Sequence, residues 1–203
     1  MQTDPAEIID YWLGTDQLSV ESMKPQWKLW YSVNTETDNT IRERFGDALH
    51  EAESGNLEPW QATPDGSLAL VILLDQFTRN LYRGTPDAWR NDTKALAVAE
   101  HAINTGQHLL LSVPDRIMLY RPHHHAEDAQ QQQKAVTLFS ELKAAGGEIW
   151  EDEVENHLSF VRGHAKIVET FGRFPHRNQI LGRVSTTEEQ AHLEKDSRAY
   201  GQE

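Results

Sequence analysis

The sequence predicts an all-α fold, a multi-helix α-α array. Apolar residues recur at helical spacing along most of the chain, and N-cap residues and Gly or Pro stops bracket these segments. No segment alternates apolar and polar residues as a half-buried strand does. We therefore expect roughly eight to ten helices and no sheet. With 203 residues, 38% of them hydrophobic, the chain predicts a single helical domain over residues 1–203.

Three helices are expected at the N-terminus. A capping box at residues 4–7 begins the first helix, which ends at Gly14. The second begins near Met23 and has one aromatic face. Thr37 or Asp38 caps the third, which continues to the next glycine.

Residues 68–74 form the longest apolar run and predict a central helix that is buried on every side. The pattern continues to Tyr82, which is too far for a buried strand. Asp75 directly follows the run, and Arg79 lies one turn later on the same face. A carboxylate so close to the core must be paired, so a structural bridge between Asp75 and Arg79 is the simplest expectation.

Five further helices complete the predicted fold. They begin at Asn91 or Asp92, at residues 112–115, at residue 126, at residue 148 and at a capping box over residues 185–188. The helix over residues 126–145 starts with a glutamine run, residues 130–133, which we interpret as a solvated face. The helix over residues 148–171 is expected to place Ile149 in the interior.

Composition excludes several classes of protein. The chain has 19 basic and 32 acidic side chains and a formal net charge of -13, which disfavours nonspecific binding to nucleic acid or to anionic membranes. Without cysteine it has no disulfide, no Cys-based metal site and no thiol nucleophile. The longest apolar run is far shorter than the roughly 20 residues of a spanning helix, and the N-terminus has no signal-peptide pattern. We expect a cytoplasmic protein.

One segment of this acidic chain is cationic. Residues 162–183 carry five basic side chains and one acidic one, a net charge of +4. Together with Arg79 and Arg83, the segment offers several guanidinium groups, whose geometry matches carboxylates and phosphates. The alternative is that neighbouring carboxylates neutralise these arginines in structural ion pairs.

Three polar blocks carry a resemblance to a known family. Residues 73–85 (LLDQFTRNLYRGT), residues 125–128 (HAED) and residues 171–183 resemble the signature blocks of the bacterial domain-of-unknown-function 924 family. The match spans residues 4–193, and it implies a tetratricopeptide-like helical fold with no established activity. It singles out the polar positions that the family shares: Arg79, Asn80, His125, Glu127, Arg173, His176, Arg177 and Asn178. The chain departs from the pattern at Arg121, His123 and His124, where the family more often has an apolar residue, Leu, and Glu or Gln.

The histidines do not complete a metal site. Three successive residues, 123–125, cannot converge on one ion from a helix, although His124 with Asp128 would supply two ligands of the three or four that a site requires. We expect no metal and no cofactor, with His123 and His124 exposed. His164 lies on an apolar helix face, where a satisfied interior histidine is the default and a ligand-facing one is the alternative.

We expect the three blocks to converge on one site for a small anionic molecule, a carboxylate or a phosphate. The candidate ligand-binding residues are four arginines and four other polar residues: Arg79, Arg83, Arg173, Arg177, Asp75, Asn80, His164 and Asn178. His125 or His176, with Glu127, would act as acid or base, because a histidine titrates near neutral pH.

Three alternatives remain open from the sequence. A tetratricopeptide-like scaffold would clamp an acidic peptide or a protein C-terminus in an open groove, whereas an enclosed pocket would favour the small molecule. A metal-dependent hydrolase lacks a ligand set. The converging blocks would also serve as a buried polar network that ties helices together. The sequence indicates neither the ligand, nor a reaction, nor the oligomeric state.

Overall fold

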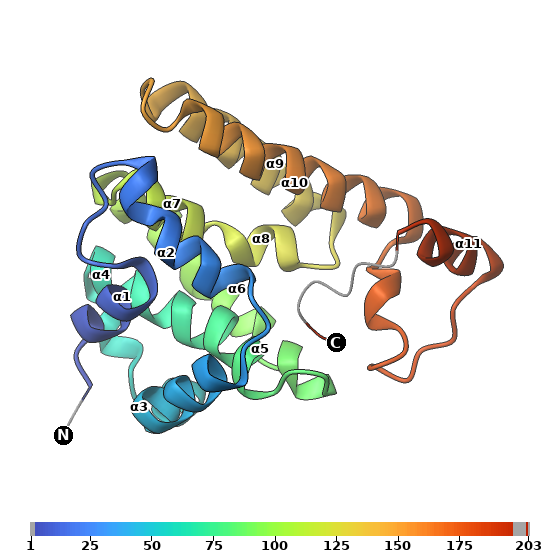
Figure 1. The fold of residues 1–203 in the computed structure, drawn as a ribbon, viewed down its shortest axis with the longest axis horizontal. Helices are drawn as coiled ribbons and strands as arrows, with labels where there is room; N and C mark the ends of the chain where they lie inside the picture. The colour runs from blue at the N-terminus through green and yellow to red at the C-terminus, as the bar shows by residue number, and fades with distance from the viewer. Residues whose placement is uncertain (1–2, 197–201, 203) are drawn as a thin grey trace.

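Helices and short helical turns form all the regular structure of residues 3–196 and 202, which are the residues that the computed structural model describes. No strand occurs among them, so the all-α prediction is confirmed. The tetratricopeptide-like arrangement is compatible with this fold and stays a prediction. Figure 1 shows the N-terminal helices packed into one body, with the α9 and α10 pair lying across it.

The N-terminal body is built around an apolar helix. Its elements are α1 (Pro5–Leu13), α2 (Val20–Tyr31), α3 (Thr35–Glu53), η1 (Glu58–Ala62) and α4 (Pro64–Val71). Asp4 caps α1, and a glycine, Gly14, ends it, as expected. The expected cap of α3 is wrong, because Asn34 accepts from the backbone N–H of Glu36 at 2.8 Å. Thr37 is buried inside α3.

The central apolar run lies in a helical segment that contains a π-helical turn. After α4, the segment continues as the π-helix η2 (Ile72–Phe77) and then as α5 (Thr78–Leu81). The backbone N–H and the hydroxyl of Thr78 both reach the carbonyl oxygen of Leu73, five residues earlier. All of residues 68–77 are buried, which confirms the predicted central helix. Turns of this kind are frequent at functional sites.

The C-terminal half adds a helical pair and several short elements. They are η3 (Pro86–Trp89), α6 (Asp92–Asn104), η4 (Gln107–Leu110), α7 (Val113–Leu119), α8 (Arg121–His125), α9 (Ala129–Ala145), α10 (Glu151–Phe171), η5 (Pro175–Arg177) and α11 (Thr187–Lys195). The helices α9 and α10 pack along one another, and α8 lies beneath them in Figure 1. The helix α7 begins at residues 112–115, as the sequence predicts, and a capping box of Ser112 and Asp115 forms its start.

Three sequence expectations in this half are wrong in detail. The helix expected from residue 126 begins at Ala129, because Asp128 accepts from two backbone N–H groups and acts as its N-cap. Gln132 is buried rather than solvated, and its amide donates to the carbonyl oxygens at the end of α8. Ile149 is 64% exposed because it lies in the turn before α10.

The last helix also starts later than expected. Its capping box is formed by Thr186 and Glu189, one residue beyond the predicted box. No helix in the described part of the chain is long and apolar enough to cross a membrane.

A substitution in the central segment should reduce stability. Leu73 is fully buried, so Leu73→Ala should lower the free energy of unfolding by about 2–5 kcal/mol through lost burial and the cavity left behind. Urea denaturation followed by circular dichroism measures this change. The control is Leu110→Ala, since Leu110 is 78% exposed and should cost far less. Equal effects of the two substitutions would contradict the assigned core.

Candidate functional site

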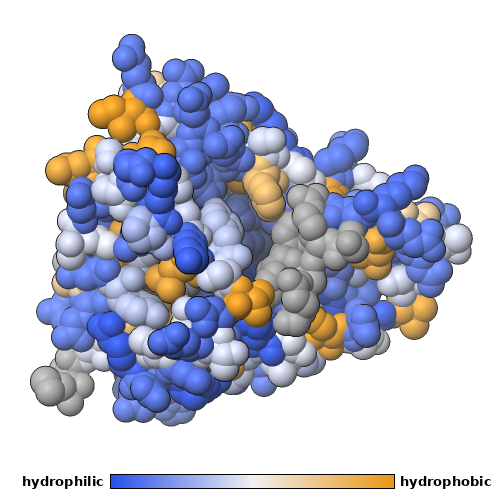
Figure 2. Space-filling view, viewed as in Figure 1, coloured by the Kyte–Doolittle hydropathy of each residue, from blue (hydrophilic) through white to orange (hydrophobic). Residues whose placement is uncertain are grey.

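A cavity of about 660 Å³ opens between α2 and the η2–α5 segment on one side and α8, α10 and η5 on the other. Figure 2 shows it as a hollow in the face drawn. Arginines, histidines and aromatic side chains dominate its lining: Arg79, Arg83, Arg121, Arg177, His124, His125, His157, His164, His176, Trp30, Tyr31, Trp89 and Phe160. Most lining residues come from α2, the η2–α5 segment, η3, α8, α10 and η5, and Gln202 also lines the cavity, so chain segments that are distant in sequence meet here.

Asp75 lies beneath the cavity and is fully buried. Its carboxylate accepts from Nδ1 of His125 at 2.8 Å, from Nη2 of Arg79 at 3.1 Å and from the amide of Gln76. Burial alone would raise the pKa of Asp75, but His125 and Arg79 hold it well below its usual range. The carboxylate is therefore ionised, and the expected bridge between Asp75 and Arg79 is present.

His125 is positioned by Asp75 and faces the cavity. Because the ionised carboxylate accepts, Nδ1 carries the ring proton, and Nε2 is left as an acceptor. Burial lowers the pKa of His125 to about 4; Asp75 opposes this shift, whereas the charge of Arg79 adds to it. The imidazole is thus neutral at pH 7 and has a lone pair for a ligand.

Arg79 and Arg177 share a second carboxylate, that of Asp92 at the start of α6. Nη2 of Arg79 lies 2.9 Å from one oxygen of Asp92, whereas Nη1 of Arg177 lies 3.6 Å from the other. Arg177 also donates from Nη2 to the backbone carbonyl of His125 at 2.9 Å and lies over the ring of Phe174. Burial and the neighbouring charge of Arg79 lower the pKa of Arg177 to about 10, so it stays charged at pH 7.

Arg83 and Asn80 connect the cavity to α3. Arg83 donates to both oxygens of Asp38 at 3.0 Å, and the amide of Asn80 donates to the same carboxylate at 2.8 Å. This two-pronged pair neutralises Arg83.

Among the described residues, Arg121 is the cavity-lining arginine that has no carboxylate within 4 Å. It is buried, and none of the described carboxylates lies within 4 Å of its guanidinium. Nη2 donates to the hydroxyl of Tyr31 at 2.9 Å, and Nη1 donates to the side-chain oxygen of Gln76 at 3.3 Å. The guanidinium also lies over the rings of Trp30 and Tyr31. Neutral partners alone therefore hold this charge in place.

Three predicted site residues lie in ion-pair clusters outside the cavity lining. Glu127 accepts from Arg183 at 2.7 Å and from the backbone N–H of Phe174 at 2.8 Å. Arg173 and Asn178 both donate to the buried carboxylate of Glu189. These contacts fix the segment around η5.

The other predicted residues are brought together. Around or beneath the one cavity lie Asp75, Arg79, Asn80, Arg83, His125, His164, His176 and Arg177. His164 and His176 are neutral at pH 7, because burial lowers the pKa of each to about 3.

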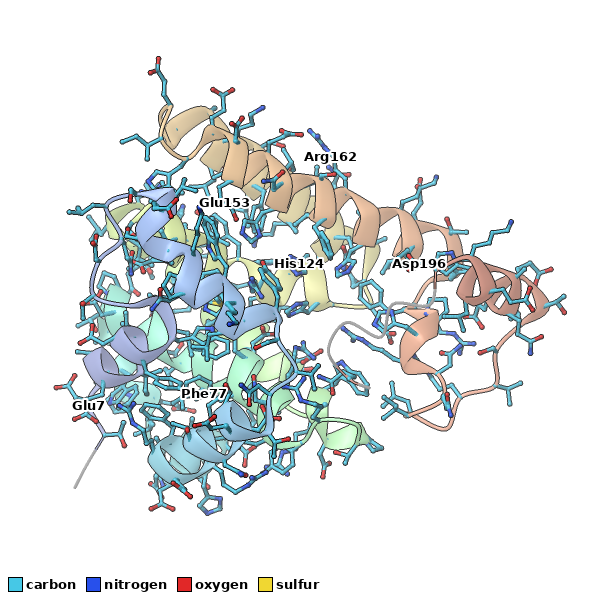
Figure 3. The ribbon with its side chains drawn as sticks, in the orientation of Figure 1. Glu7, Phe77, His124, Glu153, Arg162 and Asp196 are labelled. Atoms are coloured by element: carbon cyan, nitrogen blue, oxygen red, sulfur yellow. The ribbon has the colours of Figure 1, made fainter. Side chains whose placement is uncertain are left out.

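The expectation that His123 and His124 are exposed is wrong. His123 is fully buried, and its Nδ1 lies 2.8 Å from the side-chain oxygen of Gln131. His124 is buried between the rings of His125 and His164, and Figure 3 shows it near the centre of the molecule. The short helix α8 is covered by its neighbours, so His123 and His124 are buried, while His124 and His125 also line the cavity. Among the described residues, no three His, Asp or Glu side chains are grouped to hold a metal ion.

Sequence reasoning missed two charged residues of the lining, although each has a signal. Arg121 directly follows the apolar residues 117–120, as Asp75 follows residues 68–74. Glu153 lies one helical turn before the inner-face histidine His157. A charged side chain next to a buried run has to find a partner or a cavity.

The comparison with protein families shows to which family the chain belongs. The family model described as bacterial protein of unknown function (DUF924) matches residues 8–197. The chain belongs to the DUF924 family. A solved structure of a protein of unknown function from Agrobacterium tumefaciens is similar to this DUF924 protein, with a TM-score of 0.79 and 37% sequence identity. The match covers 94% of this chain and 97% of that one. No curated protein matches the sequence.

The buried histidines should make the stability of this DUF924 protein depend on pH. Burial lowers the pKa of His164 from 6.5 to about 3, so the unfolded state binds its proton first as pH falls. The stabilising contribution is complete above pH 6.5 and is lost as pH falls from there towards 3. The free energy of unfolding should fall between pH 6.5 and 5 by up to about 1.4 kcal/mol per pH unit for each such histidine.

Urea denaturation at several pH values measures this slope. His164→Gln should reduce the slope by the contribution of one histidine, whereas His50→Gln, at an exposed position of α3, should leave it unchanged. If His164→Gln and the parent protein lose stability equally over this range, the neutral state assigned to His164 is incorrect.

Proposed function

We propose that this DUF924 protein binds a small anionic molecule, a carboxylate or a phosphate, in the cavity of about 660 Å³. The observation that carries the proposal is Arg121, a buried guanidinium with no described carboxylate within 4 Å. Buried charges in proteins are normally paired, because an isolated charge is costly to remove from water. An anionic group on a ligand would supply the partner.

Arg177 supports the same proposal. It lines the cavity and is 6% exposed; its nearest described carboxylate is 3.6 Å away, and its Nε has no hydrogen-bond partner. Arg121 is the first residue of α8, and Arg177 donates to the carbonyl oxygen of His125, its last residue. The charge of Arg177 is balanced by the carboxylate of Asp92, so Arg121 is left as the guanidinium that lacks an acidic partner among the described residues.

The size and lining of the cavity favour a small molecule over a peptide clamp. Small-molecule sites usually have volumes of about 300–1,000 Å³ and mostly apolar walls with a few placed polar groups. This cavity falls in that range, and aromatic side chains form part of its wall.

Acid–base chemistry on the bound molecule is a further part of the proposal. His125 is oriented by Asp75 and offers Nε2 to the cavity, the arrangement of a carboxylate-positioned general base. Its pKa of about 4 is too low for an efficient base at pH 7, and Arg79 and Arg121 contribute to that low value. A bound anion would offset these charges and raise the pKa of His125 towards the working pH.

The test is binding of phosphate, succinate and 3-phenylpropionate by isothermal titration calorimetry. Arg121→Gln should weaken the binding of whichever anion binds by about tenfold or more, since a hydrogen-bonded charge is lost. The matched control is Arg173→Gln, because Arg173 is paired with Glu189 outside the cavity and should not affect the dissociation constant. Equal affinities in the two variants, or no binding of any of the three anions, would refute the proposal.

A further inference from the structure

Among the described residues, a carboxylate of the cavity lining also lacks a charged partner. Glu153 lies on α10 and lines the cavity, with a side chain that is 15% exposed. The contact with His157, 3.2 Å from Nε2 to Oε1, lowers the pKa of Glu153, so the carboxylate is ionised. His157 itself is neutral at pH 7, because burial lowers its pKa. No Lys or Arg in the described part of the chain lies within 4 Å of Glu153.

The remaining charges of the cavity neutralise one another. Arg79 and Arg177 face the carboxylates of Asp75 and Asp92, and Arg83 is paired with Asp38. The lining histidines with lowered pKa values are uncharged at pH 7.

Of the charged lining residues that the structure describes, one cation and one anion are left over. Arg121 and Glu153 line the same cavity but are not within 4 Å of each other, and each is held by neutral side chains. A ligand with a single negative charge would satisfy Arg121 and leave Glu153 uncompensated. A ligand with one negative and one positive group would satisfy both and leave the charge balance of the cavity unchanged.

Aromatic side chains lie beside Arg121 and line the cavity that Glu153 also lines. Tyr31 and Phe160 are 62% and 49% exposed, and they line the cavity together with Trp30. The indole of Trp30 is fixed by a hydrogen bond of 2.7 Å to the carbonyl oxygen of Trp12. Figure 3 shows Glu153 on the side of α10 that faces α2, the helix that carries Trp30 and Tyr31. The aromatic faces suit the apolar body of a ligand, and such faces next to a carboxylate also suit an ammonium group.

We propose that the ligand is a zwitterion with an apolar or aromatic body, an amino acid or a short peptide, whose carboxylate binds Arg121 and whose ammonium group binds Glu153. This inference rests on the proposed function, because it assigns the anionic group of the ligand to Arg121. It adds the second charge and therefore defines the class of ligand.

The experiment compares four matched ligands by isothermal titration calorimetry at pH 7 with the full chain. Phenylalanine and the dipeptide phenylalanyl-phenylalanine carry both charges, whereas 3-phenylpropionate lacks the ammonium group and 2-phenylethylamine lacks the carboxylate. At least one of the two zwitterions should bind about tenfold tighter than either singly charged ligand. Which of the two binds tighter distinguishes an amino acid from a peptide.

Variants then assign the two charges to residues. Glu153→Gln should remove the advantage of the zwitterion over 3-phenylpropionate and leave 3-phenylpropionate binding unchanged. Arg121→Gln should remove the higher affinity of the zwitterion relative to 2-phenylethylamine. The control is Glu155→Gln, since Glu155 lies on the same helix but is paired with Lys143 and Arg162 on the surface.

The outcomes separate the two proposals. If 3-phenylpropionate binds as tightly as the zwitterions and depends on Arg121, the zwitterion inference is overturned and anion binding stands. A tighter zwitterion whose affinity is unaffected by Glu153→Gln also overturns the inference. If no carboxylate binds in a manner that depends on Arg121, both proposals fail. The comparison of ligands in the parent protein holds even where a variant does not fold.

Discussion

The ionised carboxylate of Asp75 is the constraint on which the cavity depends. A fully buried charge has to be compensated, and its partners come from its own segment and from α8, across 50 residues of sequence. Arg79 also pairs with Asp92, which faces Arg177 on η5. The side chain of Gln76 donates to Asp75 and accepts from Arg121. One buried charge therefore holds the helices that surround the cavity. Such a network is rigid, and the ligand groups proposed here would meet side chains that are already in place.

Most helices of this protein could be predicted from the sequence, because their signals are local. The cap at Asp4, the stop at Gly14 and the capping box at Ser112 all act within a few residues of the ends that they define. The π-helical turn and the end of α8 could not be predicted in this way. The end of α8 depends on Gln132, whose amide satisfies backbone carbonyls from the next helix, and no local pattern shows that contact.

Two signals predict residues of the site. The family resemblance indicates Arg79, Asn80, His125, His176 and Arg177, all of which line the cavity. A charge that adjoins an apolar run indicates Asp75, and the same signal applies to Arg121, which departs from the family pattern. Residue type alone also gives wrong predictions. Arg173 and Glu127 suit a ligand by residue type, but in the structure each pairs with another side chain. The carboxylate that pairs with Arg173 lies 16 residues further along the chain, so the pairing becomes visible only when the chain has folded.

The π-helical turn at residues 72–77 determines how the segment would respond to the loss of one residue. A π turn is equivalent to an α-helix that has received one extra residue. Because the wider π turn absorbs that residue, removing it would restore regular α-helical winding and leave the later side chains in nearly the same directions around the helix axis. Arg79 and Asn80 would still face Asp92 and Asp38. Among DUF924 chains, a one-residue gap in this segment is therefore compatible with the same cavity.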